Sequence, residues 1–186
     1  MKVKICGIMS FEDVVYCNDL LPDYVGFIFS ESKRRISLSE AEMFKSYLDK
    51  RIQVVGVFIN EDISFIKKIL DAGVIDMIQL QGGESSKYLK TLREITTLPI
   101  INNNKDSRYA EYTVFNGQEA GSGKMINWNT IKSKKPFFIG GGLNAFNIKD
   151  AVKVNPFAVD VSTGVEINGK KNYELMKEFI TTCKAL

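Results

Sequence analysis

Residues 2–29, KVKICGIMSFEDVVYCNDLLPDYVGFIF, contain the unit from which the rest of the fold can be built. Two apolar runs, KVKIC (2–6) and YVGFIF (24–29), flank the amphipathic stretch FEDVVYCNDL (11–20). Ser10 precedes this stretch as a candidate N-cap, with an aspartate three residues further on, which is the spacing of a capping box. Both apolar runs are nearly continuous, as is typical of strands in a parallel sheet that helices cover on both faces. The segment therefore predicts two parallel strands joined by a helix.

The same alternation continues to the end of the chain. Six further strand-like runs are separated by helical patterns or short connectors, and they read QVVGVFI (53–59), IDMIQL (75–80), LPIIN (98–102), YTVF (112–115), PFFIG (136–140) and FAVDVS (157–162). Eight strands, each followed by a helix or an abbreviated connector, predict an α/β fold of the (β/α)8 barrel type. An open doubly wound sheet is the alternative, but it normally uses about five or six strands and would leave two runs unexplained.

Two of the connectors are too short for a full helix. The stretch NNNKDSRYAE (102–111) has room for about one or two helical turns, and NWNTIKSK (127–134) predicts a short helix at best. Full helices are expected at 38–50, 61–73, 84–96, 145–154 and 172–185. These abbreviated connectors explain why 186 residues suffice for a fold that usually takes about 250. No linker divides residues 1–186, so a single domain is expected.

The composition limits the chemistry that the protein can perform. The chain has no histidine, so it lacks the usual proton-transfer group at neutral pH and the commonest zinc ligand. Its net charge of +3 is too small to indicate a nucleic-acid partner. No apolar run approaches the roughly 18 residues of a membrane span. The three cysteines (Cys6, Cys17 and Cys183) show no paired spacing, which indicates reduced thiols and a cytoplasmic location.

Glycines and hydroxyl side chains follow the last two strands of the expected barrel. In this fold, active sites lie at the C-terminal ends of the strands, and loops seven and eight form the usual phosphate site. Strand seven ends in glycines, and the backbone N–H groups of Gly141 and Gly142 can approach an anion closely. Strand eight is followed by Ser162, Thr163 and Gly164, which add hydroxyl and N–H donors. A phosphate-bearing ligand is therefore expected at these two loops.

The ends of two other strands carry residues that could bind a ligand or take part in a reaction. The loop FSESKRRIS after strand two contains Lys33, Arg34 and Arg35. Most of a charge run is normally solvated, but an arginine at a strand end can bind a carboxylate through its planar fork. Cys6 ends the first strand, where it is either a small buried hydrophobe or a reactive thiol.

Several short stretches are individually unspecific, but their order and spacing together form a specific pattern. They are KICGI, GFIF, SKRRIS, VGVFIN, IQLQGGES, GSGKMINW, GGLN and DVSTGVE followed by NGKK, and they run the full length of the chain. In these stretches the sequence resembles the phosphoribosylanthranilate isomerase family of tryptophan biosynthesis, which has a (β/α)8 fold. Related phosphate-binding barrels such as indole-glycerol-phosphate synthase share the glycine pairs but lack KICG together with DVS-GVE. The family carries out an Amadori rearrangement of an aminoaldose phosphate, without a metal or cofactor.

The resemblance implies roles for the matching residues. Cys6 is expected to be the general base, and Arg34 is expected to hold the anthranilate carboxylate. Asp160 is expected to orient the sugar hydroxyls, and Gln79, at the end of strand four, is assigned to substrate binding. The phosphate is expected at Gly141, Gly142, Ser162, Thr163 and Gly164. The implied partner is one small phosphosugar–anthranilate substrate, bound by a monomer or a homodimer.

Three positions depart from the family pattern. Gln81 stands where the family has a histidine after strand four, Asn102 stands where it commonly has a lysine after strand five, and the third departure concerns the general acid. The family's general acid is an aspartate at the end of strand six, a position that aligns with Asn116 in YTVFNGQEAGSGK. An amide can donate a hydrogen bond to the ring oxygen but cannot deliver a proton, and general acid catalysis typically contributes about 10²–10⁴-fold. Three hypotheses follow. The protein is a working isomerase in which Asp106, Glu119 or spontaneous ring opening replaces the acid, a phosphosugar-binding barrel with reduced or altered activity, or an enzyme for a different aminosugar phosphate.

Overall fold

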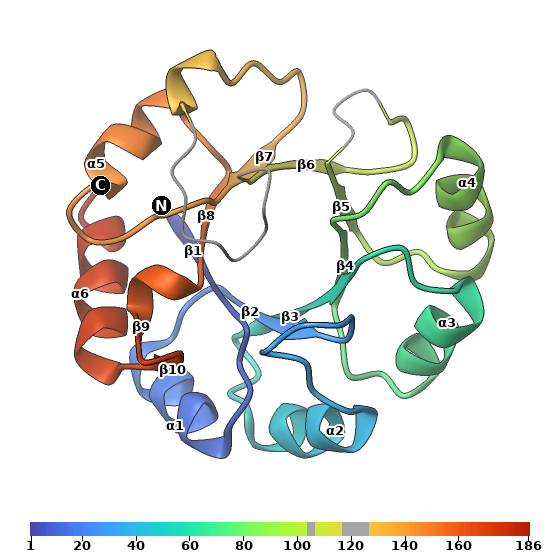
Figure 1. The fold of residues 1–186 in the computed structure, drawn as a ribbon, viewed down its shortest axis with the longest axis horizontal. Coiled ribbons are helices and arrows are strands. Elements are labelled where there is room, and N and C mark those ends of the chain that lie inside the picture. The colour runs from blue at the N-terminus through green and yellow to red at the C-terminus, as the bar shows by residue number, and fades with distance from the viewer. Residues whose placement is uncertain (104–106, 117–126) are drawn as a thin grey trace.

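The chain folds into a closed barrel of eight parallel strands (Figure 1). A computed structural model describes residues 1–103, 107–116 and 127–186. Each strand pairs with its neighbours in the sequence, and β1 pairs with β8 to close the ring. The strands are β1 (Lys2–Cys6), β2 (Tyr24–Ile28), β3 (Gln53–Phe58), β4 (Met77–Leu80), β5 (Ile100–Asn102), β6 (Tyr112–Phe115), β7 (Phe137–Ile139) and β8 (Ala158–Val161). The (β/α)8 barrel expected from the alternating pattern is confirmed.

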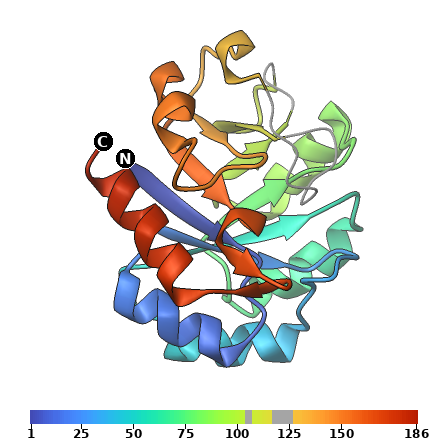
Figure 2. The same ribbon diagram turned by 60° about the vertical axis from the view of Figure 1, so that its left-hand side comes forward.

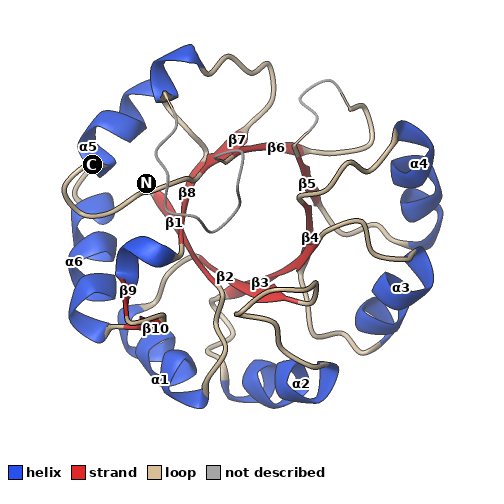
Figure 3. Ribbon diagram, viewed as in Figure 1, coloured by secondary structure: helices blue, strands red, loops and turns tan. Residues whose placement is uncertain are grey.

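Helices form the outer layer of the barrel (Figure 3). They are α1 (Phe11–Leu20), α2 (Leu38–Tyr47), α3 (Ile63–Asp71), α4 (Ser86–Ile95), α5 (Ile148–Ala151) and α6 (Tyr173–Lys184), with 3₁₀ turns η1 (Trp128–Thr130), η2 (Val152–Val154) and η3 (Thr163–Val165). Helix α1 has the predicted bounds, and Ser10 forms the expected capping box with Asp13. Figure 2 shows α6 running beside β1, so that the two ends of the chain lie close together.

The connectors around β6 are abbreviated, as the sequence predicts. The described residues between β5 and β6 contain no helix, and η1 is the only helical turn described between β6 and β7. The stretch expected to be helical at 145–154 instead forms the short α5 followed by η2. Its first residues are held in a turn, because the Asn144 side chain accepts hydrogen bonds from the backbone N–H groups of Phe146 and Asn147.

A small hairpin that the sequence analysis did not predict follows η3. Strands β9 (Glu166–Ile167) and β10 (Lys170–Lys171) pair in an antiparallel manner, so that Lys171 lies opposite Glu166. Asn168 and Gly169 join them with φ angles of 52° and 77°, as the type I′ turn of a two-residue hairpin requires. The Asn-Gly dipeptide was the available signal. The hairpin lies close to α1 and α6 (Figure 1).

Aromatic side chains fill the barrel interior near the amino ends of the strands. The Phe138 ring is fully buried, and its centroid lies 5.7 Å from that of Tyr24, 5.6 Å from that of Tyr112 and 5.6 Å from that of Phe157. These rings pack edge-on or tilted, the geometry that aromatic quadrupoles favour. This aromatic floor fills the barrel interior near the amino ends of the strands, so a site inside the barrel is expected at their carboxyl ends.

We expect Phe138→Ala to lower the free energy of unfolding by about 3–5 kcal/mol, because the surrounding rings cannot collapse into the space. Phe138→Leu, which keeps most of the volume, should cost clearly less. Urea titration followed by circular dichroism measures both. A loss of less than about 1 kcal/mol for the alanine variant would show that the floor is not a packed layer.

Candidate active site

The predicted base, Cys6, ends β1 with its thiol directed into the barrel. Cys6 pairs in register with Gly26 of β2, whose face is set by the inward-packed Tyr24 two residues earlier. A Cβ atom placed on Gly26 would lie only 2.7 Å from the Cys6 Sγ. The glycine in GFIF therefore makes room for the thiol, which is 7% exposed.

The surroundings of Cys6 have opposing effects on the pKa of its thiol. Burial raises the pKa of the thiol, and the nearby Asp160 carboxylate also raises it. The ammonium groups of Lys4 and Lys171 lower the pKa of Cys6, but burial prevails and leaves it above the usual 9.0. Two cations are present, but their effect is smaller than the cost of placing a thiolate in a dry interior.

Lys4 and Asp160 form a buried ion pair below Cys6. They are register partners on β1 and β8, and the Lys4 Nζ lies 2.9 Å from the Asp160 Oδ2. The Lys4 side chain is 0% exposed and the Asp160 side chain 6%. Burial lowers the pKa of Lys4, but the Asp160 carboxylate and, less strongly, Cys6 raise it above its ordinary value. Lys4 is therefore a charged ammonium beside the predicted base, a role that the sequence analysis did not assign.

Gln79 and Asp160 carry buried polar atoms in the barrel interior that have no hydrogen-bond partner among the described residues. Both polar atoms of the Gln79 amide are buried and make no hydrogen bond to described residues, and the same holds for the Asp160 Oδ1. Buried polar groups normally have hydrogen-bond partners, so these atoms mark a space for water or a polar ligand. The structure thus brings Gln79 and Asp160, both predicted site residues, to one polar interior.

Asn116, the residue predicted to stand at the family's general-acid position, follows β6 at the same rim. A Cβ atom on Gly140 would clash with the Asn116 Oδ1, and it would also lie 3.1 Å from the Asp160 backbone oxygen. The first glycine after β7 therefore leaves space for the Asn116 side chain. This geometry agrees with the strand-end position predicted for Asn116.

The backbones of loops seven and eight lie in direct contact at Gly164 and Leu143. A Cβ atom on Gly164 would clash with the Leu143 carbonyl oxygen, so only glycine permits this approach. Gly141 and Gly142 have φ angles of 83° and 67°, a region that favours glycine. Within the described residues, the backbone N–H groups of Gly141, Gly142 and Gly164 donate no hydrogen bond. The two loops together thus offer a cluster of free backbone donors.

Arg34 is the one member of the basic loop that is held in place. Lys33 and Arg35 are exposed, whereas the Arg34 side chain is 15% exposed. Its Nε and Nη2 atoms donate to Glu166 at 2.8 Å and 2.7 Å. The Lys171 Nζ lies 2.6 Å from the Glu166 Oε1. Glu166 and Lys171 were missed from sequence, because they lie more than a hundred residues along the chain from Arg34.

Some expected features fall outside the described residues. These are the two alternative acids, Asp106 and Glu119, and the glycines of the AGSGK stretch at 120–124. Among the described residues, no group of three or more histidine, cysteine, aspartate or glutamate side chains could hold a metal ion. Nor does this part of the chain contain a helix with the length and apolar character needed to cross a membrane.

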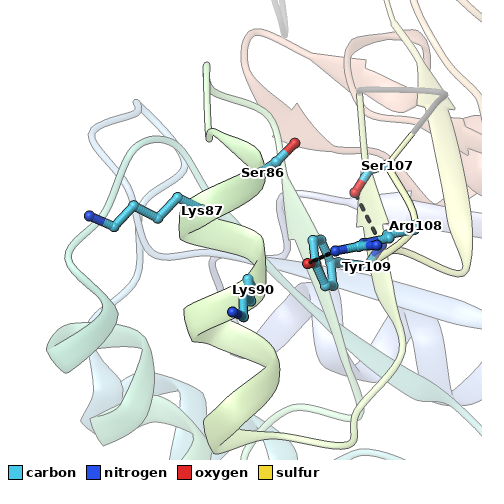
Figure 4. Close-up of a pocket in the computed structure, with 6 residues that line it drawn as sticks. All are labelled: Ser86, Lys87, Lys90, Ser107, Arg108 and Tyr109. Carbon is cyan, nitrogen blue, oxygen red and sulfur yellow. Dashed lines mark hydrogen bonds between the residues drawn. The ribbon is translucent and has the colours of Figure 1, made fainter.

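A cavity of about 450 Å³ lies between α4 and the connector that precedes β6 (Figure 4). It is lined by Ser86, Lys87, Lys90, Ser107, Arg108 and Tyr109. Arg108 donates a hydrogen bond to the Tyr109 hydroxyl and stacks on its ring. The cavity lies along the outside of the barrel, where the described residues between β5 and β6 contain no helix, and none of the predicted site residues lines it. We therefore place the candidate active site at the strand ends.

A closed parallel barrel whose polar groups and glycines meet at the carboxyl ends of several strands defines a (β/α)8-barrel enzyme. Comparison with known proteins then specifies the family. A family model described as N-(5′-phosphoribosyl)anthranilate isomerase matches residues 3–182. The chain belongs to the N-(5′-phosphoribosyl)anthranilate isomerase family.

Individual relatives agree along the whole chain. An N-(5′-phosphoribosyl)anthranilate isomerase from Endomicrobium trichonymphae is 40% identical over 198 residues, covering 100% of this chain and 99% of the relative. The crystal structure of phosphoribosyl anthranilate isomerase from Thermotoga maritima is 30% identical with a TM-score of 0.85, covering 100% of both chains. A structure of such an isomerase with reduced 1-(o-carboxyphenylamino)-1-deoxyribulose 5-phosphate is 29% identical with a TM-score of 0.83, again over 100% of both chains.

We expect Lys4→Met to lower the free energy of unfolding by about 3–5 kcal/mol, because it leaves the Asp160 carboxylate buried without its counter-charge. The double variant Lys4→Met/Asp160→Asn removes both charges and should recover part of this loss. Urea titration of the wild type, both single variants and the double variant gives the coupling energy. Additive single effects would contradict a direct ion pair.

Proposed function

We propose that this chain catalyses the Amadori rearrangement of N-(5′-phosphoribosyl)anthranilate to 1-(2-carboxyphenylamino)-1-deoxyribulose 5-phosphate in tryptophan biosynthesis. The observation that carries the proposal is the buried thiol of Cys6 at the barrel rim, beside the Lys4–Asp160 ion pair and within electrostatic range of Lys171. Membership of the isomerase family supports this activity over a phosphosugar-binding barrel with reduced or altered activity.

In this proposal the two ends of the substrate bind on different loops. The phosphate accepts hydrogen bonds from the backbone N–H groups of Gly141, Gly142 and Gly164, with the hydroxyls of Ser162 and Thr163 beside them. The support is the close approach of the two loops and the free donors of the glycines. Backbone N–H groups suit a phosphate because they are fixed and need no reorganisation when the anion arrives.

The carboxylate and the sugar bind toward the other strands. Arg34 takes the anthranilate carboxylate through its guanidinium, the group that best fits a planar anion. Asp160 and Gln79 receive the sugar hydroxyls. Their unpartnered buried atoms, the Asp160 Oδ1 and both polar atoms of the Gln79 amide, support this role.

The reaction then proceeds in three steps. Protonation of the ring oxygen breaks the C1′–O bond, while the nitrogen lone pair forms a C1′=N⁺ bond. The Cys6 thiolate removes the C2′ proton, the C–H electron pair forms the C1′=C2′ bond, and the C=N⁺ pair returns to nitrogen as an enolamine. Loss of the enol proton and protonation of C1′ give the ketone. A thiolate is a suitable base because histidine is absent from the chain and a cysteine titrates closer to neutrality than a lysine.

This chain differs from its family in the step that opens the ring, because Asn116 stands where the family has the aspartate that donates the proton. We propose that the Asn116 amide donates a hydrogen bond to the ring oxygen, and that the proton itself comes from Asp106, Glu119 or water. The position of Asn116 beside Gly140, at the rim shared with Asp160, supports contact with the ring oxygen. No metal or cofactor is required by these steps.

The proposal also covers the setting in which the enzyme acts. We propose a cytoplasmic enzyme, monomeric or homodimeric, with one small phosphosugar–anthranilate substrate. The three cysteines support a reducing compartment, because all of them are free and buried.

We expect the chain to restore growth without tryptophan in a bacterial strain that lacks this isomerase. Cys6→Ser should abolish this growth and lower kcat/KM of the purified enzyme by at least about 10²-fold, the range of general base catalysis. Because the pKa of Cys6 is raised, the thiolate fraction and hence kcat/KM of the wild type should increase from pH 7 towards pH 9. Cys183→Ser, on α6, serves as the control for loss of a thiol. A serine variant with near-normal kcat/KM would disprove the role of Cys6.

We expect Asn116→Asp to raise kcat, by up to about 10²-fold, because a carboxyl group can deliver the proton that an amide cannot. The variant should also make kcat fall as the pH rises past the pKa of the new carboxyl group, since that group must be protonated to act. Steady-state kinetics between pH 5 and 9 measure both. Unchanged or lower kcat would show that Asn116 does not occupy the acid position.

A further inference from the structure

We infer that Glu166 and Lys171 position Arg34, so that one edge of its guanidinium is fixed by protein and the other faces the substrate carboxylate. The inference rests on the proposed function, in which Arg34 binds that carboxylate. It assigns two positioning residues on the β9–β10 hairpin, and neither of them needs to touch the substrate.

The division of the guanidinium into two edges follows from its contacts. The Nε and Nη2 atoms donate to the two carboxylate oxygens of Glu166 at 2.8 Å and 2.7 Å. A guanidinium has five N–H donors in a rigid fork, so three remain at the Nη1/Nη2 end. Among the described residues, none accepts a hydrogen bond from the Arg34 Nη1. That end can take a second carboxylate in the same bidentate manner.

The charge of the cluster explains why Lys171 is needed. A carboxylate paired with Arg34 alone would cancel the charge that attracts an anionic substrate. The Lys171 Nζ lies 2.6 Å from the Glu166 Oε1, so two cations share one anion and a net positive charge remains. Burial lowers the pKa of Lys171, while Glu166 opposes this effect. The Lys171 side chain is 1% exposed and that of Glu166 is 5% exposed, so solvent screens the cluster weakly.

The backbone holds the cluster of Arg34, Glu166 and Lys171 close to Gly7, the residue that follows Cys6. Glu166 and Lys171 are register partners in the hairpin, and the Lys171 Nζ also donates to the Ser162 carbonyl at 3.3 Å. The stem of Arg34 lies over Gly7, where an added Cβ atom would come within 2.5 Å of the Arg34 Cδ. Arg34 is thus restrained at its stem and at one edge of its head, which reduces the entropy lost when the substrate binds.

A competing interpretation makes the opposite prediction. Glu166 could mimic the substrate carboxylate and occupy Arg34 until the substrate displaces it. Its removal would then tighten binding of the carboxylate. The contacts favour positioning, because Lys171 holds Glu166 independently of Arg34 and displacement would leave a buried carboxylate with only one of its two cations.

The test measures how strongly the enzyme prefers a ligand with the ring carboxylate. Two probes are titrated by calorimetry: reduced 1-(o-carboxyphenylamino)-1-deoxyribulose 5-phosphate, and the same compound without the carboxylate. The wild type should bind the first roughly 10–100-fold more tightly, as expected for a charge-assisted bidentate contact. Absence of this preference in the wild type would refute the role of Arg34 in the proposed function, before Glu166 is tested at all.

We expect Glu166→Gln to reduce this preference about tenfold or more, while affinity for the probe without the carboxylate stays within about twofold. In turnover, KM should rise with little change in kcat. Lys171→Met should also reduce the preference, because it removes the surplus positive charge. Asp49→Asn is the matched control, since Asp49 accepts from the Nε and Nη2 of Arg51 at 2.9 Å and 2.8 Å in the same geometry on the surface.

Three results would overturn the inference. They are tighter binding of the carboxylate probe by Glu166→Gln, equal weakening of both probes, and an unchanged preference. If Glu166→Gln does not fold, Glu166→Asp answers the same question, because it keeps the charge but is too short for both hydrogen bonds. That variant should retain part of the preference, and full retention would contradict a positioning role.

Discussion

The pairing of β1 with β8 is the contact on which the rest of the structure depends. It closes the sheet into a barrel and sets Lys4 opposite Asp160. Side chains alternate between the two faces of a strand, so Cys6 then lies on the same inner face as Lys4. A slip of β1 by one residue would turn Lys4 and Cys6 toward the apolar helix layer and leave Asp160 inside the barrel without its counter-charge.

Closure also divides the interior into two halves with different chemistry. The aromatic floor around Phe138 is dry and packed, and it fills the interior near the amino ends of the strands. Above it, buried charges are paired with charges of opposite sign: Asp160 pairs with Lys4, and Glu166 pairs with Arg34 and Lys171. A single unpaired charge in such surroundings costs several kcal/mol, so the ion pairs maintain the polar half rather than add net stability.

The strands and helices could be predicted well from the sequence, whereas the buried ion pairs could not, and the reason is physical. Apolar runs and capping residues are local signals, so all eight strands and the bounds of α1 followed from short stretches. The ion pairs are not local: Lys4 and Asp160 are 156 residues apart, and Arg34 and Glu166 are 132 apart. A lysine in an apolar strand does not reveal which face it occupies or what it meets. The raised pKa of Cys6 is likewise not readable from residue types, because it depends on the depth at which the thiol is buried.

The raised pKa of Cys6 is compatible with its proposed role as a base. Without substrate, burial keeps the thiol protonated, which protects it from oxidation and alkylation. Ring opening places a cationic C=N⁺ group in the same space, and an added positive charge stabilises the thiolate by the same Coulomb term through which Lys4 and Lys171 act. A thiolate formed in a dry site is a stronger base than one in water, so the factor that disfavours its formation also increases its capacity to remove the C2′ proton. Burial therefore couples formation of the base to the arrival of the intermediate on which it acts.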